Sequence, residues 1–253
     1  MSRLNSFHLP ASQWPVSVQP GQTVTLDGPE ARHLLGVLRA KPGEVVRLFD
    51  GQGRHGRFAL QTAKGKNCAL LEAVEIVSEQ RPASGLVLAL GWSKSSRRDW
   101  LLEKGVELDA AGLWFWRGAR SQGDVPDAPK DTWEDKLVQA AKQCGASWLP
   151  ELRCVAGGSG GLGKEFSNFA SVTLLWEGAE PGAILRPGSF RSGLHLAIVG
   201  PEGGLDEEEA RHFRDAGATP ASLGPRPLRW ETAALLCLGL AHQDRISTGA
   251  YGN

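Results

Sequence analysis

Two glycine-rich segments near the C-terminus hold residues whose types and spacing could do chemistry. In the first, an apolar run over 194–199 ends at Gly200-Pro201, and Glu202 and two more glycines follow it. Ligands of open α/β sheets bind beyond the carboxyl ends of strands, where glycine lets the backbone approach closely. A strand-to-helix turn that needs glycine for its own geometry is the alternative. The segment alone does not decide between the two.

The second segment, residues 222–233, is a loop stiffened by two prolines that leads into an apolar helix. It brings Arg226, Arg229 and Glu231 to the start of that helix. Two prolines and two arginines at this place are difficult to explain by packing. A carboxylate at a helix N-terminus is also good capping, so Glu231 has a structural interpretation as well.

Other candidate sites are weaker. The glycine-rich run over 157–163 resembles a phosphate loop, but residues 153–155 are too short for the strand that must precede one. We therefore predict a flexible surface loop there. The four cysteines and six histidines show no metal-site spacing, so we predict no metal and reduced thiols.

Composition limits the function classes. The 253 residues carry 28 basic and 28 acidic side chains, so overall charge does not indicate a nucleic-acid partner. Residues 1–80 are weakly basic, with nine Lys or Arg against seven Asp or Glu, while residues 131–253 have eleven against fifteen. Any RNA contact must come from local patches. No apolar run reaches the roughly 18 residues of a membrane span, and no signal peptide is evident, which predicts a cytoplasmic protein.

The elements that must position these loops fall into two groups. Residues 1–80 read as short strands over 23–26, 45–49, 55–61 and 68–77 with one helix over 30–38, which predicts a small β-barrel. Residues 78–85 are polar and rich in chain breakers, and form the predicted linker.

After the linker, buried strands alternate with helices, which predicts an α/β domain with a mostly parallel sheet. The strands are expected over 86–90, 113–116, 172–176 and 194–199, and the helices over 97–109, 132–144, 206–216 and 231–245. Asp206 is the expected N-cap of its helix, Glu209 completes a capping box, and Gly217 ends the helix.

Both loops together resemble a known family. They read Gly200-Pro-Glu-Gly-Gly204 and Leu223-Gly-Pro-Arg-Pro-Leu-Arg-Trp-Glu-Thr-Ala233, and they resemble the ribosomal RNA small subunit methyltransferase E family of the SPOUT class. His33-Leu-Leu-Gly-Val-Leu-Arg39, Lys94, Arg120-Ser121 and Ala140-Ala-Lys-Gln-Cys144 match in the same order along the chain. The sequence departs from the family in Gly145-Ala-Ser-Trp148, which lacks an arginine, in Trp230, and at Asp109-Ala-Ala-Gly112.

The resemblance implies a fold and an activity. It implies a PUA-like, RNA-binding β-barrel over 1–80 and a SPOUT α/β trefoil-knot domain over 84–253. It implies S-adenosylmethionine-dependent methylation of uracil N3, at uridine 1498 of 16S ribosomal RNA in the small subunit, by a homodimer. Three loops would hold S-adenosylmethionine, through Trp176, Glu177, Gly178, Val199, Gly200, Pro201, Gly203, Gly204, Leu223, Gly224, Arg226 and Leu228.

Roles for charged residues follow from the chemistry. Uracil N3 must lose a weakly acidic proton, so Glu231 and Glu202 are candidate general bases and Arg229 a candidate for stabilising the developing charge. The candidates for RNA contact are Arg32, Arg39, Lys94, Arg97 and Arg120. We interpret His33 as a buried structural residue rather than an RNA contact. Trp114 and Trp116 are interpreted as core or dimer-interface residues rather than base-stacking ones.

Two other functions stay open. A SPOUT methyltransferase acting on transfer RNA or another ribosomal site would keep the fold and change the substrate. A non-catalytic RNA-binding assembly factor would account for the missing arginine near Ala146 and for Trp230. Binding of S-adenosylmethionine separates the assembly factor from both enzymes.

Overall fold

The computed structural model describes residues 4–15, 19–94 and 96–249, which form two compact units. The first comprises residues 1–81 together with 138–149, and the second comprises residues 82–137 and 150–253. A segment from the middle of the chain therefore completes the N-terminal unit.

The first unit is built on a five-stranded sheet in the order β1-β3-β4-β5-β2. Its one parallel pair is β1 with β3, and the other neighbours are antiparallel. Two register shifts between β4 and β5 let the sheet curl. The strands are β1 (Ser6–His8), β2 (Thr23–Asp27), β3 (Val45–Phe49), β4 (Arg54–Ala63) and β5 (Cys68–Ser78), with a 3₁₀ turn at Ala11–Gln13 and α1 (Gly28–Arg32) followed by a π-helical turn, His33–Val37.

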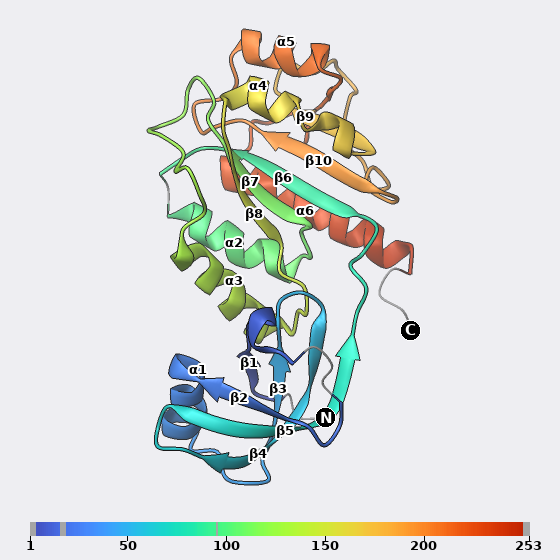
Figure 1. The fold of residues 1–253 in the computed structure, drawn as a ribbon. Coiled ribbons are helices and arrows are strands. Elements are labelled where there is room, and N and C mark those ends of the chain that lie inside the picture. The colour runs from blue at the N-terminus through green and yellow to red at the C-terminus, as the bar shows by residue number, and fades with distance from the viewer. Residues whose placement is uncertain (1–3, 16–18, 95, 250–253) are drawn as a thin grey trace. The chain divides into compact units, whose positions relative to one another are not determined.

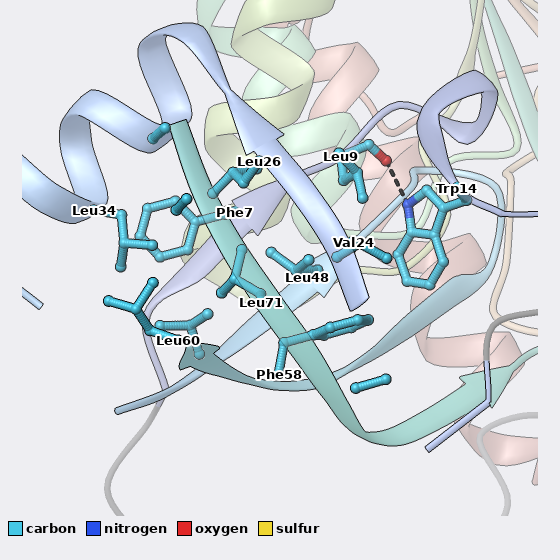
Figure 2. Packing of buried hydrophobic residues seen from close by; sticks show 14 residues of the cluster. Phe7, Leu9, Trp14, Val24, Leu26, Leu34, Leu48, Phe58, Leu60 and Leu71 are labelled. Atoms are coloured by element: carbon cyan, nitrogen blue, oxygen red, sulfur yellow. Dashed lines mark hydrogen bonds between the residues drawn. The ribbon is translucent and has the colours of Figure 1, made fainter. Parts of the chain in front are cut away.

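The curled sheet encloses its own apolar core (Figure 2). The ring of Trp14 lies edge-on to Phe58, with 5.7 Å between centroids, and its indole N–H donates to the carbonyl oxygen of Leu9 at 2.6 Å. Our interpretation of His33 as a buried residue is wrong. Leu34 takes the buried position of the π-helical turn, and His33 is exposed.

The second unit contains a six-stranded sheet, all parallel, in the order β11-β9-β10-β6-β7-β8. Every residue of β6 and β7 is buried, as expected of strands covered on both faces. The interpretation of Trp114 and Trp116 as core residues is confirmed. The strands are β6 (Gly85–Gly91), β7 (Gly112–Trp116), β8 (Glu151–Val155), β9 (Ser171–Leu175), β10 (Leu194–Val199) and β11 (Thr219–Ala221).

Helices cover both faces of this sheet (Figure 1). On one face α2 (Arg97–Glu107) packs against α6 (Trp230–Ser247), and on the other α4 (Gly158–Gly163) packs against α5 (Glu207–Asp215). The helix α3 (Asp131–Cys144) follows β7, and a 3₁₀ turn, Phe166–Asn168, follows α4.

Two predictions for this region are wrong. Residues 153–155, judged too short for a strand, belong to β8, and residues 158–163, predicted as a flexible loop, form α4. Leu162 is fully buried, and its burial offsets the low helix propensity of the glycines around it. Gly161 is required by close packing: a Cβ there would lie 1.8 Å from the carbonyl oxygen of Ala156.

The capping residues predicted for α5 are confirmed. Asp206 is the N-cap and accepts a hydrogen bond from the amide of Glu209 at 2.7 Å, and the Glu209 side chain returns to the amide of Asp206. Gly217 follows the helix with φ +106°, a left-handed conformation that favours glycine.

The far end of α6 is tied to two earlier segments of the second unit. Buried Asp244 accepts hydrogen bonds from the amides of Gly188 at 2.6 Å and Phe190 at 2.9 Å. Its neighbour Arg245 donates to the carbonyl oxygen of Asp109 at 3.1 Å, in a turn where Asp109 has φ +53°. Within the described residues, no helix is both long and apolar enough to cross a membrane.

Candidate functional site

A cleft of about 460 Å³ lies in the second unit, where the segments after β9 and β10 meet the loop before α6. All but one of the residues predicted to hold a cofactor line this cleft; they are Trp176, Glu177, Val199, Gly200, Pro201, Gly203, Gly204, Leu223, Gly224, Arg226 and Leu228. The exception is Gly178, which packs against the ring of Trp176. Three loops that are separate in the sequence thus share one cavity.

Other wall residues were not predicted for the cofactor. Glu202, a candidate base, lines the cleft, and so does Arg120, which was predicted for RNA contact. Leu175, Leu205, Ser222, Pro225, Pro227, Trp230 and Ala233 complete the wall. Most of these are neighbours of predicted residues, and only Arg120 comes from a distant segment.

Glycines allow the loops around the cleft to pack backbone against backbone. A Cβ at Gly91, the last residue of β6, would lie 2.2 Å from the amide nitrogen of Pro201. A Cβ at Gly118 would lie 3.0 Å from the ring of Pro201, and one at Gly203 would lie 2.9 Å from Cβ of Arg120. The segment 200–204 is therefore held between the ends of β6 and β7.

A hydrogen-bonded turn follows β7 and carries Arg120. The amide of Gly118 donates to the Ser121 hydroxyl, and the amide of Ser121 donates to the carbonyl oxygen of Gly118, both at 3.0 Å. Between them, the amide of Ala119 donates to buried Glu209 Oε1 at 2.7 Å. The capping carboxylate of α5 thus also fixes the turn at the cleft.

Aromatic rings form two parts of the wall. Trp176 is half-buried, and the guanidinium carbon of Arg214 lies 5.2 Å from its ring centroid. Trp230, at the start of α6, is 6% exposed, and its indole N–H has no hydrogen-bond partner among the described residues. The departure from the family pattern at Trp230 therefore places a large apolar side chain in the cleft wall.

The candidate catalytic residues at the start of α6 lie outside this wall. Arg229 is the exposed N-cap residue of α6, and neither it nor Glu231 lines the cleft. Glu231 Oε1 is 3.1 Å from Nη1 of Arg97, an arginine at the start of α2 that was predicted for RNA contact. This ion pair joins the first turns of two adjacent helices.

The remaining RNA-contact candidates lie in different units. Lys94 is exposed after β6, and its Cε is 2.5 Å from where a Cβ at Gly123 would lie, so its stem packs on the segment after β7. Arg32 and Arg39 are exposed in the first unit, and Arg39 has φ +53°.

Comparisons with known proteins identify the family. A family model described as an RNA methyltransferase domain matches residues 79–242, and one described as an RNA methyltransferase PUA domain matches residues 26–72. Ribosomal RNA small subunit methyltransferase E of Mycobacterium bovis is 31% identical over 227 residues, covering 87% of this chain and 86% of that protein. The chain belongs to the ribosomal RNA small subunit methyltransferase E family.

Further relatives extend the match over nearly the whole chain. The family member of Bacillus subtilis is 26% identical over 243 residues, covering 92% of this chain and 94% of its own. The structure of the Neisseria gonorrhoeae member, bound to S-adenosylmethionine, has a TM-score of 0.76 at 28% identity and covers 94% of this chain and 96% of its own. These matches confirm the predicted fold class, an α/β domain of the SPOUT type with a parallel sheet and a PUA-like domain.

Proposed function

We propose that this family member transfers a methyl group from S-adenosylmethionine to N3 of a uridine in small-subunit ribosomal RNA, uridine 1498 by family resemblance. The observation that carries the proposal is the cleft, because the loops with the family's two motifs line it together. Methylation of ribosomal RNA follows from membership of the family. The choice of uracil N3 follows from the resemblance and from the chemistry below.

The residues of the cleft fit the cofactor. A volume of about 460 Å³ lies in the range of small-molecule sites, and the wall combines apolar side chains with backbone groups. Glu177 and Glu202 supply negative charge for a ligand that carries a sulfonium and an ammonium group. Gly203 and Gly224 keep side chains out of the wall.

The chain's own groups must move a proton and balance a charge. When bound, the cofactor supplies an electrophilic methyl group. Glu202 lines the cleft and is exposed, so it can accept the proton of uracil N3. Glu231 is a second candidate base, and Arg97 holds its carboxylate in place. Arg229, on the N-cap of α6, is the candidate from this loop for stabilising the uracil anion.

Partners and location are part of the proposal. The RNA would be contacted by arginines of the first unit and by basic residues of the second. They are Arg32 and Arg39 in the first unit, and Lys94, Arg97 and Arg120 in the second. The family resemblance implies a homodimer, and the exposed side chains of Trp100 on α2 and Leu236 on α6 supply apolar surface for one. The trefoil knot that the resemblance implies stays a prediction. We place the protein in the cytoplasm, where the small subunit is assembled.

The decisive experiment transfers labelled methyl groups to small ribosomal subunits that lack the modification. The wild-type protein should produce 3-methyluridine at a single position, located by nuclease digestion and mass spectrometry. Glu202→Gln, Glu231→Gln and Arg229→Ala should each lower the rate, while Glu180→Gln, at an exposed site outside the cleft wall, should not.

Each alternative has its own result. Cofactor binding without label in the small subunit, together with label in transfer RNA or another ribosomal site, would establish a different substrate. Calorimetry that detects no binding of S-adenosylmethionine would refute methyl transfer and favour an assembly factor.

A further inference from the structure

Arg120 occupies an unusual place among the charged residues of the cleft. It lies on the segment after β7, about 80 residues before the first of the two family loops, yet it is part of the cleft wall. Its Nη1 donates to the carbonyl oxygen of Gly203 at 3.3 Å. That carbonyl belongs to the loop that carries Glu202, so the guanidinium and the candidate base share one corner of the cleft.

The backbone under Arg120 is fixed from three sides. The reciprocal hydrogen bonds between Gly118 and Ser121 close the turn, and buried Glu209 holds the amide of Ala119. On the third side Gly203 packs on Arg120 itself, since a Cβ there would lie 3.0 Å from the Arg120 carbonyl oxygen. The backbone that carries this donor is therefore fixed, and the hydrogen bond to Gly203 orients the exposed guanidinium on it.

The guanidinium of Arg120 has N–H donors that no described protein group uses. The bond to Gly203 is its one hydrogen bond within residues 4–15, 19–94 and 96–249, which leaves Nε–H and the Nη2 hydrogens for a ligand. The other cleft arginine, Arg226, makes no hydrogen bond or ion pair in the same part of the chain and is therefore not held in one position. Arg229 does not line the cleft.

We infer that Arg120 is a catalytic residue that stabilises the negative charge on the uracil ring as N3 loses its proton; the inference rests on the proposed function. In this step the N3 proton passes to the carboxylate of Glu202, and N3 forms a bond to the methyl carbon. The electron pair of the broken carbon–sulfur bond stays on sulfur. Until the new bond is complete, the excess charge lies on O2 and O4, which flank N3 and can accept hydrogen bonds from the guanidinium.

The charged surroundings favour this assignment. Glu177 and Glu202 are the acidic residues of the wall, Arg226 is its other cation, and Glu209 lies under the Arg120 turn. Once Glu202 has accepted the N3 proton it is neutral, and the negative charge lies on the uracil ring, in a wall that also holds the carboxylate of Glu177. The uracil anion therefore needs a cation close to it. Arg120 supplies that cation on the same loop corner.

The test compares Arg120→Ala and Arg120→Lys with a matched control, Arg117→Ala. Arg117 is an exposed arginine of the same segment, paired with Asp124 at 3.4 Å and outside the cleft wall. Three quantities are measured for each variant: the affinity for S-adenosylmethionine by calorimetry, the affinity for small subunits by filter binding, and the pH dependence of kcat. Losing one preorganised donor should lower kcat about 100-fold near neutral pH in Arg120→Ala. The affinity for S-adenosylmethionine should be unchanged, because the interaction with the uracil anion exists only in the transition state. The affinity for small subunits should fall much less than kcat, because Arg120 is one of five proposed RNA contacts.

The acidity of the uracil N3 proton can be varied to separate a catalytic role of Arg120 from a structural one. The rate deficit caused by a purely structural role would not depend on this acidity. In small subunits reconstituted from RNA with 5-fluorouridine in place of uridine, fluorine makes the N3 proton more acidic. The deficit of Arg120→Ala should shrink on this substrate and also as the pH is raised, and Arg120→Lys should lie between the wild type and Arg120→Ala. Arg117→Ala should behave as the wild type throughout.

Two results would overturn the inference. One is an Arg120→Ala variant as active as Arg117→Ala. The other is a deficit that comes with weakened cofactor binding and does not respond to fluorine or pH, which would make Arg120 only a support for the loop at Gly203. A wild-type protein that makes no 3-methyluridine would instead refute the proposed function, and the inference with it.

Discussion

Glu209 connects a helix cap to the cleft, and its removal should be measurable as both a loss of stability and a loss of activity. Its Oε1 accepts from the amide of Ala119 at 2.7 Å, and its Oε2 accepts from the amide of Asp206 at 3.3 Å. The residue is 8% exposed, so water replaces these bonds poorly. We therefore consider Glu209→Ala and the nearly isosteric Glu209→Gln.

The magnitude follows from the two bonds. A hydrogen bond to a charged acceptor contributes about 1.5–3 kcal/mol, and the short bond to Ala119 belongs in this range. The longer bond completes the capping box and adds about 0.5 kcal/mol, at the low end for a cap. Glu209→Ala should therefore lower the free energy of unfolding by about 2–3.5 kcal/mol. Glu209→Gln keeps the acceptor and loses its charge, so about 1 kcal/mol is expected.

Urea unfolding followed by tryptophan fluorescence measures these differences, with Glu208→Ala as control because Glu208 is an exposed neighbour in the same helical turn. The control should change stability by less than about 0.5 kcal/mol. Methyl transfer by Glu209→Ala should also fall, because the turn with Arg120 loses its anchor. If Glu209→Ala and Glu208→Ala proved equally stable, the carboxylate would not hold the turn and the reasoning would be refuted.

Three further predictions concern other parts of the second unit. Gly91→Ala should weaken S-adenosylmethionine binding in calorimetry, because the new Cβ would lie 2.2 Å from the Pro201 amide nitrogen. The control is Gly239→Ala, in open space within α6, which should leave binding intact and raise the free energy of unfolding by about 0.5–1 kcal/mol. Equal affinities of the two variants for S-adenosylmethionine would contradict this prediction. Burial lowers the pKa of His195 below its ordinary value of 6.5, so the unfolded chain binds the proton more tightly and the unfolding free energy should fall as the pH drops below 6.5. His195→Gln should lose less stability than the wild type between about pH 7.5 and pH 5, and parallel urea midpoints would argue against the shift. Burial raises the pKa of Cys237 to about 12, so mass spectrometry should find this thiol alkylated only after unfolding, and its labelling in the native protein would be the contrary result.

The sequence predicted most of the elements because their signals are local. The buried strands of the second unit are apolar runs in the sequence. The capping box at Asp206 and Glu209 is a short-range sequence pattern, and it is present in the structure. The elements that sequence reasoning missed lack such signals. Strands β1 and β11 have three residues each, β8 has one buried residue, and α4 consists largely of glycine. The structure of these elements depends on the sheet that they join or cover.

The same distinction applies to the site. The cofactor loops were predicted because each is a motif in consecutive residues. The position of Arg120 in the wall depends on three contacts made across the fold, with Pro201, Gly203 and Glu209. No pattern within the segment after β7 contains that information. Likewise, nothing near Glu231 in the sequence predicts its ion pair with Arg97, which lies 134 residues earlier.

The anchoring of α6 has a consequence for biosynthesis. Synthesis runs from the N-terminus, so the turn at Asp109 and the segment from Gly188 to Phe190 emerge before their partners, Arg245 and Asp244. Until those two residues appear, the amides of Gly188 and Phe190 lack their acceptor and the left-handed turn at Asp109 lacks its donor. Domains generally fold as units, in order of synthesis. The nascent second unit therefore stays incomplete after most strands of its sheet have been synthesised. In that interval its exposed strand edges can aggregate, unless chaperones cover them or synthesis of α6 follows quickly.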